Sequence, residues 1–302
     1  MKSTFDKLPD TIFLNTTCIE ATFIERCCEL LAMNKIKKLI LYSHEDIVVM
    51  PRNTIQLLDI QDSNSCHIFA GSQKTASTLQ RYFKNKIVTP VPYQIAKTTR
   101  IKRIRGSKSA IDFSNLDIVL VGSTADDRKG HVRAAKTIAW ARNFQRISKS
   151  VRTSHSLREI NFTIIGAQLY PEMDSISSKT IEILDGSLSI FPILEFPLYL
   201  EILEKQNVVI CLSQYETLPL FVSEAMARGC VVVRNDCGGM KEQLVQGRNG
   251  VRLYNSSILN GFKIFLLAQA NGEVLKDMSK ESVLRFDEIH SSPWDSSFKG
   301  LF

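Results

Sequence analysis

The chain has 302 residues, of which 44% are hydrophobic and 23% are charged. This length is typical of two domains, and the composition supports a packed core and excludes an intrinsically disordered protein. No apolar run reaches the roughly 18 residues that span a bilayer, and residues 1–10 lack the apolar region of a secretory signal. The seven cysteines are odd in number and show no CxxC spacing, which predicts reduced thiols in a cytoplasmic protein rather than disulfides or a zinc site.

The net charge is +7, from 38 basic and 31 acidic residues, and the excess is local. Residues 97–108 alone hold six cations. A solvated linker between domains is the favoured interpretation of this segment. Peripheral contact with an anionic membrane surface is a second interpretation. Nucleic acid is not expected as a partner, because no aromatic residues are interleaved with the cations and no nucleic-acid-binding motif occurs.

Strand-like and helix-like patterns alternate from the start of the chain. In the first hundred residues we expect strands at 11–16, 38–43 and 66–72, a helix over 21–34, and a further helix that ends near residue 84. Such alternation is typical of parallel βαβ units and predicts an α/β fold.

The pattern resumes after the basic segment, where we place a domain boundary that gives domains of residues 1–105 and 106–302. The second domain is expected to be a doubly wound parallel sheet, with strands at 116–122, 161–166, 188–191, 207–212, 230–234 and 250–253. A helix is expected over 131–147, and the segment from residue 260 to the end is expected to be mostly helical.

Two glutamates eight positions apart, Glu216 and Glu224, lie between two of the apolar strands. Pro219 predicts the start of a helix between them, and Gly229 its end. One carboxylate therefore follows the carboxyl end of a strand, and the other lies in the early turns of the next helix. In an open parallel sheet, ligands bind in the crevice at this edge.

The segment that holds the pair resembles the donor-binding segment of retaining glycosyltransferases of the group 1 family (family 4), which have the GT-B fold. That segment has Glu, seven residues, Glu, Ala-Met, a small residue, Gly, a Val-rich strand and a Gly-Gly turn, all present here in order up to Gly239. The resemblance covers residues 106–302 as a complete domain with a C-terminal helix that returns to the N-terminal part. Residues 1–105 resemble only the later part of the family's acceptor-side domain, so we expect a partial Rossmann-like domain, either a fragment or a naturally short form.

The resemblance implies a nucleotide-diphosphate sugar as donor substrate, a carbohydrate or lipid-linked acceptor, and no cofactor. Glu224 would hold the ribose hydroxyls, and Glu216 would lie by the donor sugar and stabilise the charge that develops there. Lys129 would neutralise the diphosphate leaving group, and His44 would lie near the donor sugar. Each residue also has a plain structural interpretation, such as a helix-start charge or a strand-end histidine.

Further donor contacts are expected from the loops around these residues: Gly122, Ser123, Arg128, Thr217, Leu218, Leu220, Gly238 and Gly239. Pro219 cannot contribute, because it has no N–H. Ser123 stands where the family carries an arginine, and Arg128 is the candidate replacement.

No metal is expected, because the histidines show no ligand spacing and Asp126 and Asp127 are adjacent rather than separated by one residue. No GxGxxG motif indicates a dinucleotide. The expected function is metal-independent transfer of a sugar with retention, in polysaccharide or glycolipid assembly. The missing arginine favours an alternative, a degenerate glycosyltransferase-like binding module. A nucleotide-sugar epimerase is a weaker alternative, because no acid and base groups for it are found in the first domain.

Overall fold

The computed structural model describes residues 9–14, 21–43, 52–91, 111–125, 127–151, 157–167, 175–185, 187–216 and 218–290. The chain divides into two compact units, and each is considered by itself. The first comprises residues 1–94, 216–218 and 292–302, and the second comprises residues 95–215 and 219–291. The expected boundary near residue 105 and the basic segment 97–108 lie outside the described residues, as do His44 and Thr217.

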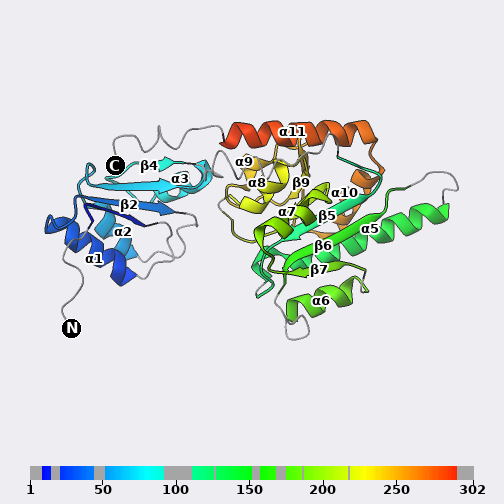
Figure 1. The fold of residues 1–302 in the computed structure, drawn as a ribbon, viewed down its shortest axis with the longest axis horizontal. Coiled ribbons are helices and arrows are strands. Elements are labelled where there is room, and N and C mark those ends of the chain that lie inside the picture. Colours follow the sequence, from blue (N-terminus) through cyan, green and yellow to red (C-terminus); the bar gives the residue numbers. More distant parts are fainter. Residues whose placement is uncertain are drawn as a thin grey trace. The chain divides into compact units, whose positions relative to one another are not determined.

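The first unit is a four-stranded parallel sheet whose strands follow one another in chain order, β1-β2-β3-β4 (Figure 1). Its elements are β1 (Thr11–Leu14), α1 (Ala21–Ala32), β2 (Lys38–Ser43), α2 (Arg52–Asp59), β3 (Cys66–Ala70), α3 (Gln73–Gln80) and β4 (Val88–Pro90). The sequence pattern does not predict β4, because it has only three residues and ends in a proline, which can donate no hydrogen bond to a ladder.

Side chains of β2 alternate between two apolar clusters, as the period of a strand requires. Leu39 and Leu41 pack with residues of α1, α2 and α3, so these three helices cover one face of the sheet. Ile40 and Tyr42 belong to a smaller cluster on the other face, where the Tyr42 hydroxyl donates to the Val91 carbonyl at 2.7 Å. All crossovers of the sheet run in one direction, which places the helices on one side.

The second unit is a six-stranded parallel sheet of order β10-β9-β8-β5-β6-β7. Its elements are β5 (Leu116–Val121), η2 (Asp127–Lys129), α5 (His131–Val151), β6 (Ile160–Ala167), α6 (Ser175–Ile183), β7 (Ser189–Pro192), α7 (Phe196–Glu204), β8 (Val208–Cys211), α8 (Leu220–Met226), β9 (Val231–Arg234), α9 (Met240–Gln243), β10 (Gly250–Arg252), α10 (Ser257–Gln269) and α11 (Gly272–His290). The six expected strands and the doubly wound order of this domain are confirmed.

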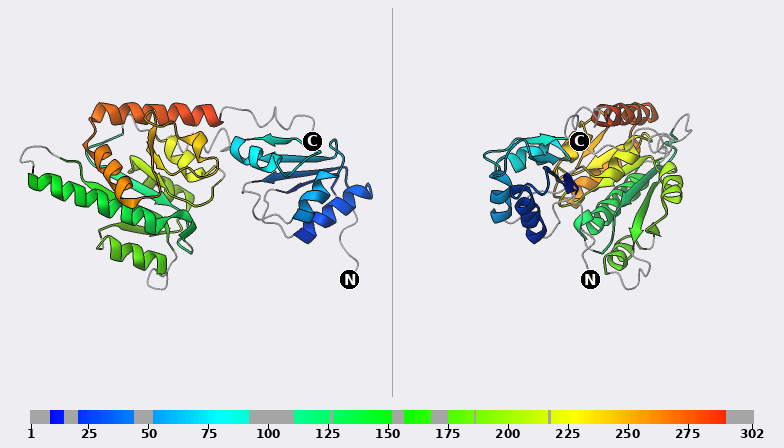
Figure 2. Two further views of the ribbon diagram at one scale, coloured as in Figure 1. Left: turned by 180° about the vertical axis from the view of Figure 1, so that it is seen from behind. Right: turned by 60° about the vertical axis from the view of Figure 1, so that its left-hand side comes forward.

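Helices cover both faces of this sheet (Figures 1 and 2). Leu116, Ile118 and Leu120 of β5 point to the face where α5 and α10 pack together. Helices α8, α9 and α11 pack together on the other face. The sheet is thus buried on both sides, which explains why its strands are almost continuously apolar.

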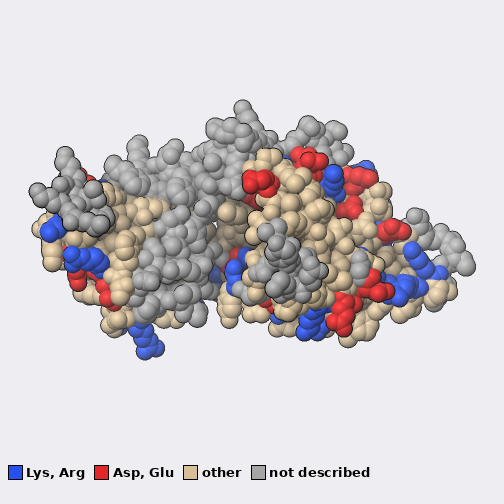
Figure 3. Space-filling model, turned by 60° about the horizontal axis from the view of Figure 1, so that its bottom comes forward, with Lys and Arg blue, Asp and Glu red and all other residues tan. Residues whose placement is uncertain are grey.

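Basic and acidic side chains are interspersed on the face of the molecule that Figure 3 shows. In the described part of the chain, no helix is both long and apolar enough to cross a bilayer.

Burial in the first unit raises the pKa of the Cys28 thiol to about 12 and that of Cys66 to about 11, from an ordinary 9.0. The folded state therefore holds these protons more tightly than the unfolded state. Their contribution to stability is full below pH 9 and is lost as the pH rises from about 9 to 12. The free energy of unfolding of this unit should decrease between neutral pH and about pH 10.5. We expect this decrease to be smaller in Cys28→Ala than in the wild type, by about 1–2 kcal/mol. Urea unfolding of the wild type and of Cys28→Ala at both pH values measures the two decreases, and equal decreases would contradict the prediction.

Candidate functional site

The six-stranded sheet reverses its order between β5 and β8. The chain adds β6 and β7 on one side of β5 and then returns to pair β8 with its other edge, Ile118 opposite Val208. Helix α5 leaves toward one face and α8 toward the other, so the loops after β5 and β8 diverge at the carboxyl edge. Ligands of open parallel sheets bind at this reversal. Lys129 follows β5 and Glu216 follows β8, as the sequence predicts.

The loop after β5 depends on two glycines. A Cβ on Gly122 would lie 2.7 Å from Cγ of Lys129, so the lysine stem packs directly over the glycine backbone. A Cβ on Gly130, which has a φ of +78°, would lie 2.4 Å from the Leu212 carbonyl oxygen. Only glycine permits these approaches without strain. The Lys-Gly pair of the sequence thus has a structural reason: Gly130 lets the loop after β5, which carries Lys129, pack against Leu212 at the end of β8.

Hydrogen bonds join the two loops at residues next to Lys129 and Glu216. The Gln214 amide donates to the Arg128 carbonyl at 2.8 Å. The Arg128 guanidinium, predicted to reach toward a phosphate, lies 3.5 Å from the Tyr215 carbonyl. Arg128, next to Lys129, therefore contacts residues 214 and 215, which directly precede Glu216.

A third loop, after β9, supports the loop after β8 from the other side. The Asn235 side-chain amide donates to the Ser213 carbonyl at 3.0 Å, and the Cys237 thiol donates to the Gln214 carbonyl at 2.7 Å. Asn235 and Cys237 lie on either side of Asp236 in the sequence. The conformation of this loop therefore controls the conformation of the loop that leads to Glu216.

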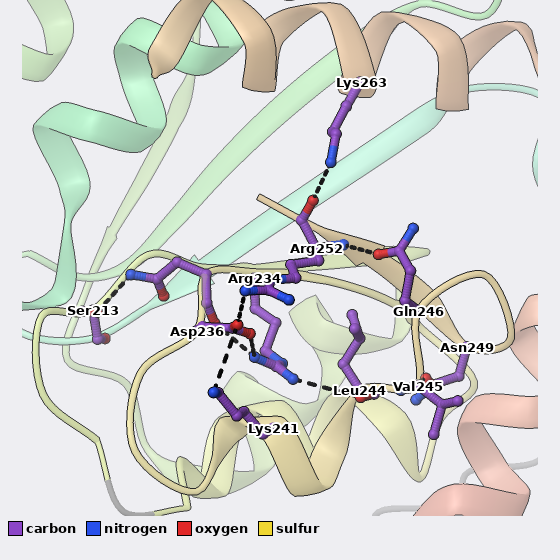
Figure 4. Close-up of polar contacts among 11 residues, drawn as sticks. Ser213, Arg234, Asp236, Lys241, Leu244, Val245, Gln246, Asn249, Arg252 and Lys263 are labelled. Carbon is purple, nitrogen blue, oxygen red and sulfur yellow. Dashed lines mark hydrogen bonds and ion pairs between the residues drawn. The ribbon is translucent and has the colours of Figure 1, made fainter. Parts of the chain in front are cut away.

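Asp236 is held by three cations, Arg234, Lys241 and Arg252 (Figure 4). Arg234 is 2% exposed, donates to Asp236 at 2.9 Å and also donates to the Asn235 carbonyl. Burial lowers the pKa of Arg234, although it stays a cation at neutral pH. A buried arginine that is paired and hydrogen-bonded in this way favours one loop conformation over others. The sequence gives no indication of the cluster around Asp236, because its members come from β9, the loop after β9, α9 and β10.

Glu224 is 4% exposed and lies in α8, whose N-cap is Pro219 as predicted. The Tyr199 hydroxyl, from α7, donates to Oε2 of Glu224 at 2.8 Å. Burial and the neighbouring Glu224 carboxylate raise the pKa of Tyr199 well above its ordinary value, so the phenol remains a donor. A buried carboxylate requires such partners. Tyr199 has no motif of its own, and sequence analysis misses it.

The start of α8 is fixed by a buried polar network. Gln243 donates to the Pro219 carbonyl at 3.0 Å and to the Ser223 hydroxyl at 2.9 Å. His290, at the end of α11, lies 3.0 Å from the same hydroxyl. The network holds the helical turn that precedes Glu224.

The other predicted donor contacts lie around these loops. Ser123 is exposed, and its hydroxyl accepts from the Ala125 amide at 3.1 Å, which forms a local turn. Leu218 is buried and Leu220 partly buried beside Pro219. Gly238 and Gly239 form the turn before α9. Thr217 and His44 lie outside the described residues, so their predicted roles stay predictions.

Among the described residues, no group of three His, Cys, Asp or Glu side chains could hold a metal ion. The only charged side chains that the sequence predicts at the reversal are Lys129, Arg128, Glu216 and Glu224. Side chains of these types are the ones that neutralise anions and accept hydrogen bonds from hydroxyl groups.

The profile of the family "Glycosyl transferases group 1" matches residues 115–279, more than half of the chain. The chain belongs to this family. The predicted resemblance is thereby confirmed over the domain in which it was strongest. Comparison with curated proteins gives no match.

Solved structures show the same fold. HepE from Anabaena, in complex with UDP-glucose, is 14% identical, with a TM-score of 0.69 over 93% of this chain and 76% of that one. Sucrose-phosphate synthase from Thermosynechococcus elongatus is 15% identical, with a TM-score of 0.69 over 95% and 70%. The pneumococcal O-GlcNAc transferase GtfA, in complex with UDP and GlcNAc, is 14% identical, with a TM-score of 0.58 over 92% and 58%. The two parallel sheets thus form a GT-B-like fold.

In this group 1 family member, we expect Gly130→Ala to lower the free energy of unfolding by about 3 kcal/mol, because the methyl group meets the Leu212 backbone and the residue has a positive φ. Gly247→Ala is the matched control, since Gly247 also has a φ of +78° but no atom lies within 4 Å of the added Cβ. It should lower the free energy of unfolding by only about 1 kcal/mol. If urea unfolding gave equal losses of unfolding free energy for the two variants, the contact of Gly130 with Leu212 would be unimportant.

We expect Tyr199→Phe to lower the free energy of unfolding by about 1–3 kcal/mol, because it removes a hydrogen bond from a buried carboxylate. Tyr254→Phe, at a tyrosine that is 49% exposed, should change it by less than about 0.5 kcal/mol. Urea unfolding of both variants measures the difference, and similar values would mean that the Tyr199 hydroxyl gives Glu224 no support.

Proposed function

We propose that this protein binds a nucleotide-diphosphate sugar at the carboxyl edge of the six-stranded sheet and transfers the sugar to an acceptor with retention of configuration. The observation that carries the proposal is the contact between the loops after β5 and β8 at the reversal of the sheet. It supports the proposal because it joins the loop that carries Lys129 to the residues that lead to Glu216, at the edge where such folds bind ligands.

The proposed roles follow from the chemistry of each group. Lys129 faces the diphosphate and balances the negative charge that grows as the nucleoside diphosphate leaves. Glu224 accepts hydrogen bonds from the two ribose hydroxyls, because an ionised carboxylate has several acceptor sites. Glu216 stabilises the positive charge that develops on the donor sugar. The Gly238–Gly239 turn allows the backbone to approach the phosphate or the sugar.

No side chain is assigned as the base in this proposal. The acceptor hydroxyl attacks the anomeric carbon on the face from which the diphosphate departs, and the leaving phosphate oxygen takes the hydroxyl proton. The enzyme's part is to hold donor and acceptor in place and to neutralise charge, which accounts for large rate effects. The transfer is proposed to need no metal, with Lys129 as the counter-charge.

UDP-sugars are the first donors to test, because HepE was solved with UDP-glucose and GtfA with UDP and GlcNAc. The proposed acceptor is a carbohydrate or a lipid-linked sugar, in polysaccharide or glycolipid assembly in the cytoplasm. The proposed donor and the proposed acceptor follow from similarity to other proteins rather than from contacts in this chain.

One observation favours a second candidate, a module that binds the donor without transferring the sugar. Ser123 replaces the arginine of the family pattern, and its hydroxyl is engaged with the Ala125 amide. The nearby guanidinium of Arg128 lies by the Tyr215 carbonyl. With one cation fewer, the transition state of a departing diphosphate is stabilised less, and the effect on rate exceeds that on binding.

Calorimetric titration with UDP-glucose, UDP-GlcNAc and GDP-mannose, combined with an assay of nucleoside diphosphate release, separates the two candidates. We expect Glu224→Gln to weaken binding of UDP about tenfold or more, because it removes charge-assisted hydrogen bonds. We expect Glu216→Gln to leave UDP binding nearly unchanged and to lower sugar transfer by about 10²–10³-fold.

Glu201→Gln, at an exposed glutamate of α7, is the control and should change neither quantity. Donor binding without any release of nucleoside diphosphate would support the binding module. Absence of binding to every nucleotide sugar by the wild-type chain would overturn both candidates.

A further inference from the structure

The outer side of α5 and α10, away from the sheet, carries an unusual number of exposed apolar side chains. Six of them are between 39% and 61% exposed: Trp140, Ile147, Ile258, Leu259, Phe262 and Leu266. Single exposed apolar residues are normal, but a contiguous group on a folded surface indicates an interaction.

These side chains form one continuous surface. Trp140 and Ile147 lie on one face of α5, two turns apart, and Phe262 and Leu266 lie one turn apart on α10. The helices touch, since a Cβ on Gly261 would lie 2.4 Å from Cβ of Trp140. Phe144 joins the two sides, with its ring centroid 6.0 Å from that of Trp140 and 5.5 Å from that of Phe262.

The same two segments contain no acidic residue. Residues 128–158, which include α5, hold nine Lys and Arg and no Asp or Glu. Residues 243–272, which include α10, hold three Lys and Arg and again no acid. All 31 acidic residues of the chain lie elsewhere. Lys136 is exposed one turn before Trp140, and Lys263 flanks the apolar surface on α10, 3.9 Å from the ring centroid of Tyr254.

We propose that the outer side of α5 and α10 binds peripherally to an anionic lipid bilayer. Tryptophan, phenylalanine and aliphatic side chains on a helical face partition into the interface, and exposed cations beside them, such as Lys136, pair with anionic headgroups. This surface lies within the second unit and is separate from the basic segment 97–108. It does not depend on the proposed sugar transfer.

Two other occupants fit this surface less well. A second copy of the chain bound through the same face would bring the two sets of cations together, and neither segment offers an acid to pair with them. Single-stranded nucleic acid stacks on aromatic rings, whereas four of the six exposed residues, Ile147, Ile258, Leu259 and Leu266, are aliphatic. Aliphatic side chains instead favour insertion among lipid chains.

Flotation of the full chain with vesicles tests the proposal, with phosphatidylcholine alone and with phosphatidylcholine containing about one-third phosphatidylglycerol. We expect binding to the anionic vesicles only, and weaker binding as salt screens the lysines and arginines. Ile147→Asp and Lys136→Glu should each weaken binding about tenfold, the first by removing apolar insertion and the second by reversing a charge.

Helix α11 provides matched controls, because it is also long but carries both acids and bases. Leu284→Asp, at a leucine 54% exposed, and Lys280→Glu should leave vesicle binding within about twofold of the wild type. Urea unfolding and UDP titration of every variant show whether it is folded and whether the donor site is independent of this surface.

Several results would overturn the proposal. They are equal binding to neutral and anionic vesicles, no binding at all, or equal losses in the α5 and α11 variants. Sedimentation equilibrium that shows a dimer dissociated by Ile147→Asp would assign the surface to a second copy. Displacement from vesicles by RNA at stoichiometric amounts, with Lys136→Glu losing RNA binding, would assign it to nucleic acid.

Discussion

The main-chain hydrogen bond from Gln214 to Arg128 is the contact on which the candidate site depends. The reversal of the sheet sends α5 and α8 to opposite faces, which by itself would leave the loops after β5 and β8 apart. The hydrogen bond, with Gly130 packed on Leu212, brings these two loops into contact. The loop that carries Lys129 therefore contacts the residues that lead to Glu216, although 87 positions of the chain separate Lys129 from Glu216.

Around this contact, the structure uses buried polar groups to keep flexible loops in one conformation. Arg234 and its neighbours hold Asp236 in the loop after β9, which supports the loop that leads to Glu216. Gln243 and His290 hold the start of α8, and Tyr199 holds Glu224 itself. Groups of this kind contribute little net stability, but they strongly disfavour alternatives in which a buried charge would lose its partner. Preorganisation of this sort is what binding and catalysis require.

The two sides of helix α5 have different surroundings: the inner side packs on the sheet, and the outer side is exposed. Its first residues follow directly from the lysine loop, so the packing of the helix against β5, β6 and α10 positions that loop. Its inner side is apolar because the sheet must be covered. Nothing in the fold requires its outer side to be apolar or free of acids, which is why that side points to a partner. The residues on the two sides of a helix can be chosen independently, because positions one turn apart share a face.

The sequence alone determined the α/β class, the strands of the second domain and the family resemblance of the segment from Cys211 to Gly239. It could do so because strand periodicity, the positions of Pro219 and Gly229, and the spacing of Glu216 and Glu224 are local properties. Only the tertiary structure showed that Tyr199 supports Glu224, that Asp236 joins three cations and that α5 and α10 form one surface. These contacts join residues between 2 and 121 positions apart. For the distant ones, no local pattern encodes which side chains meet when strands pair and helices pack.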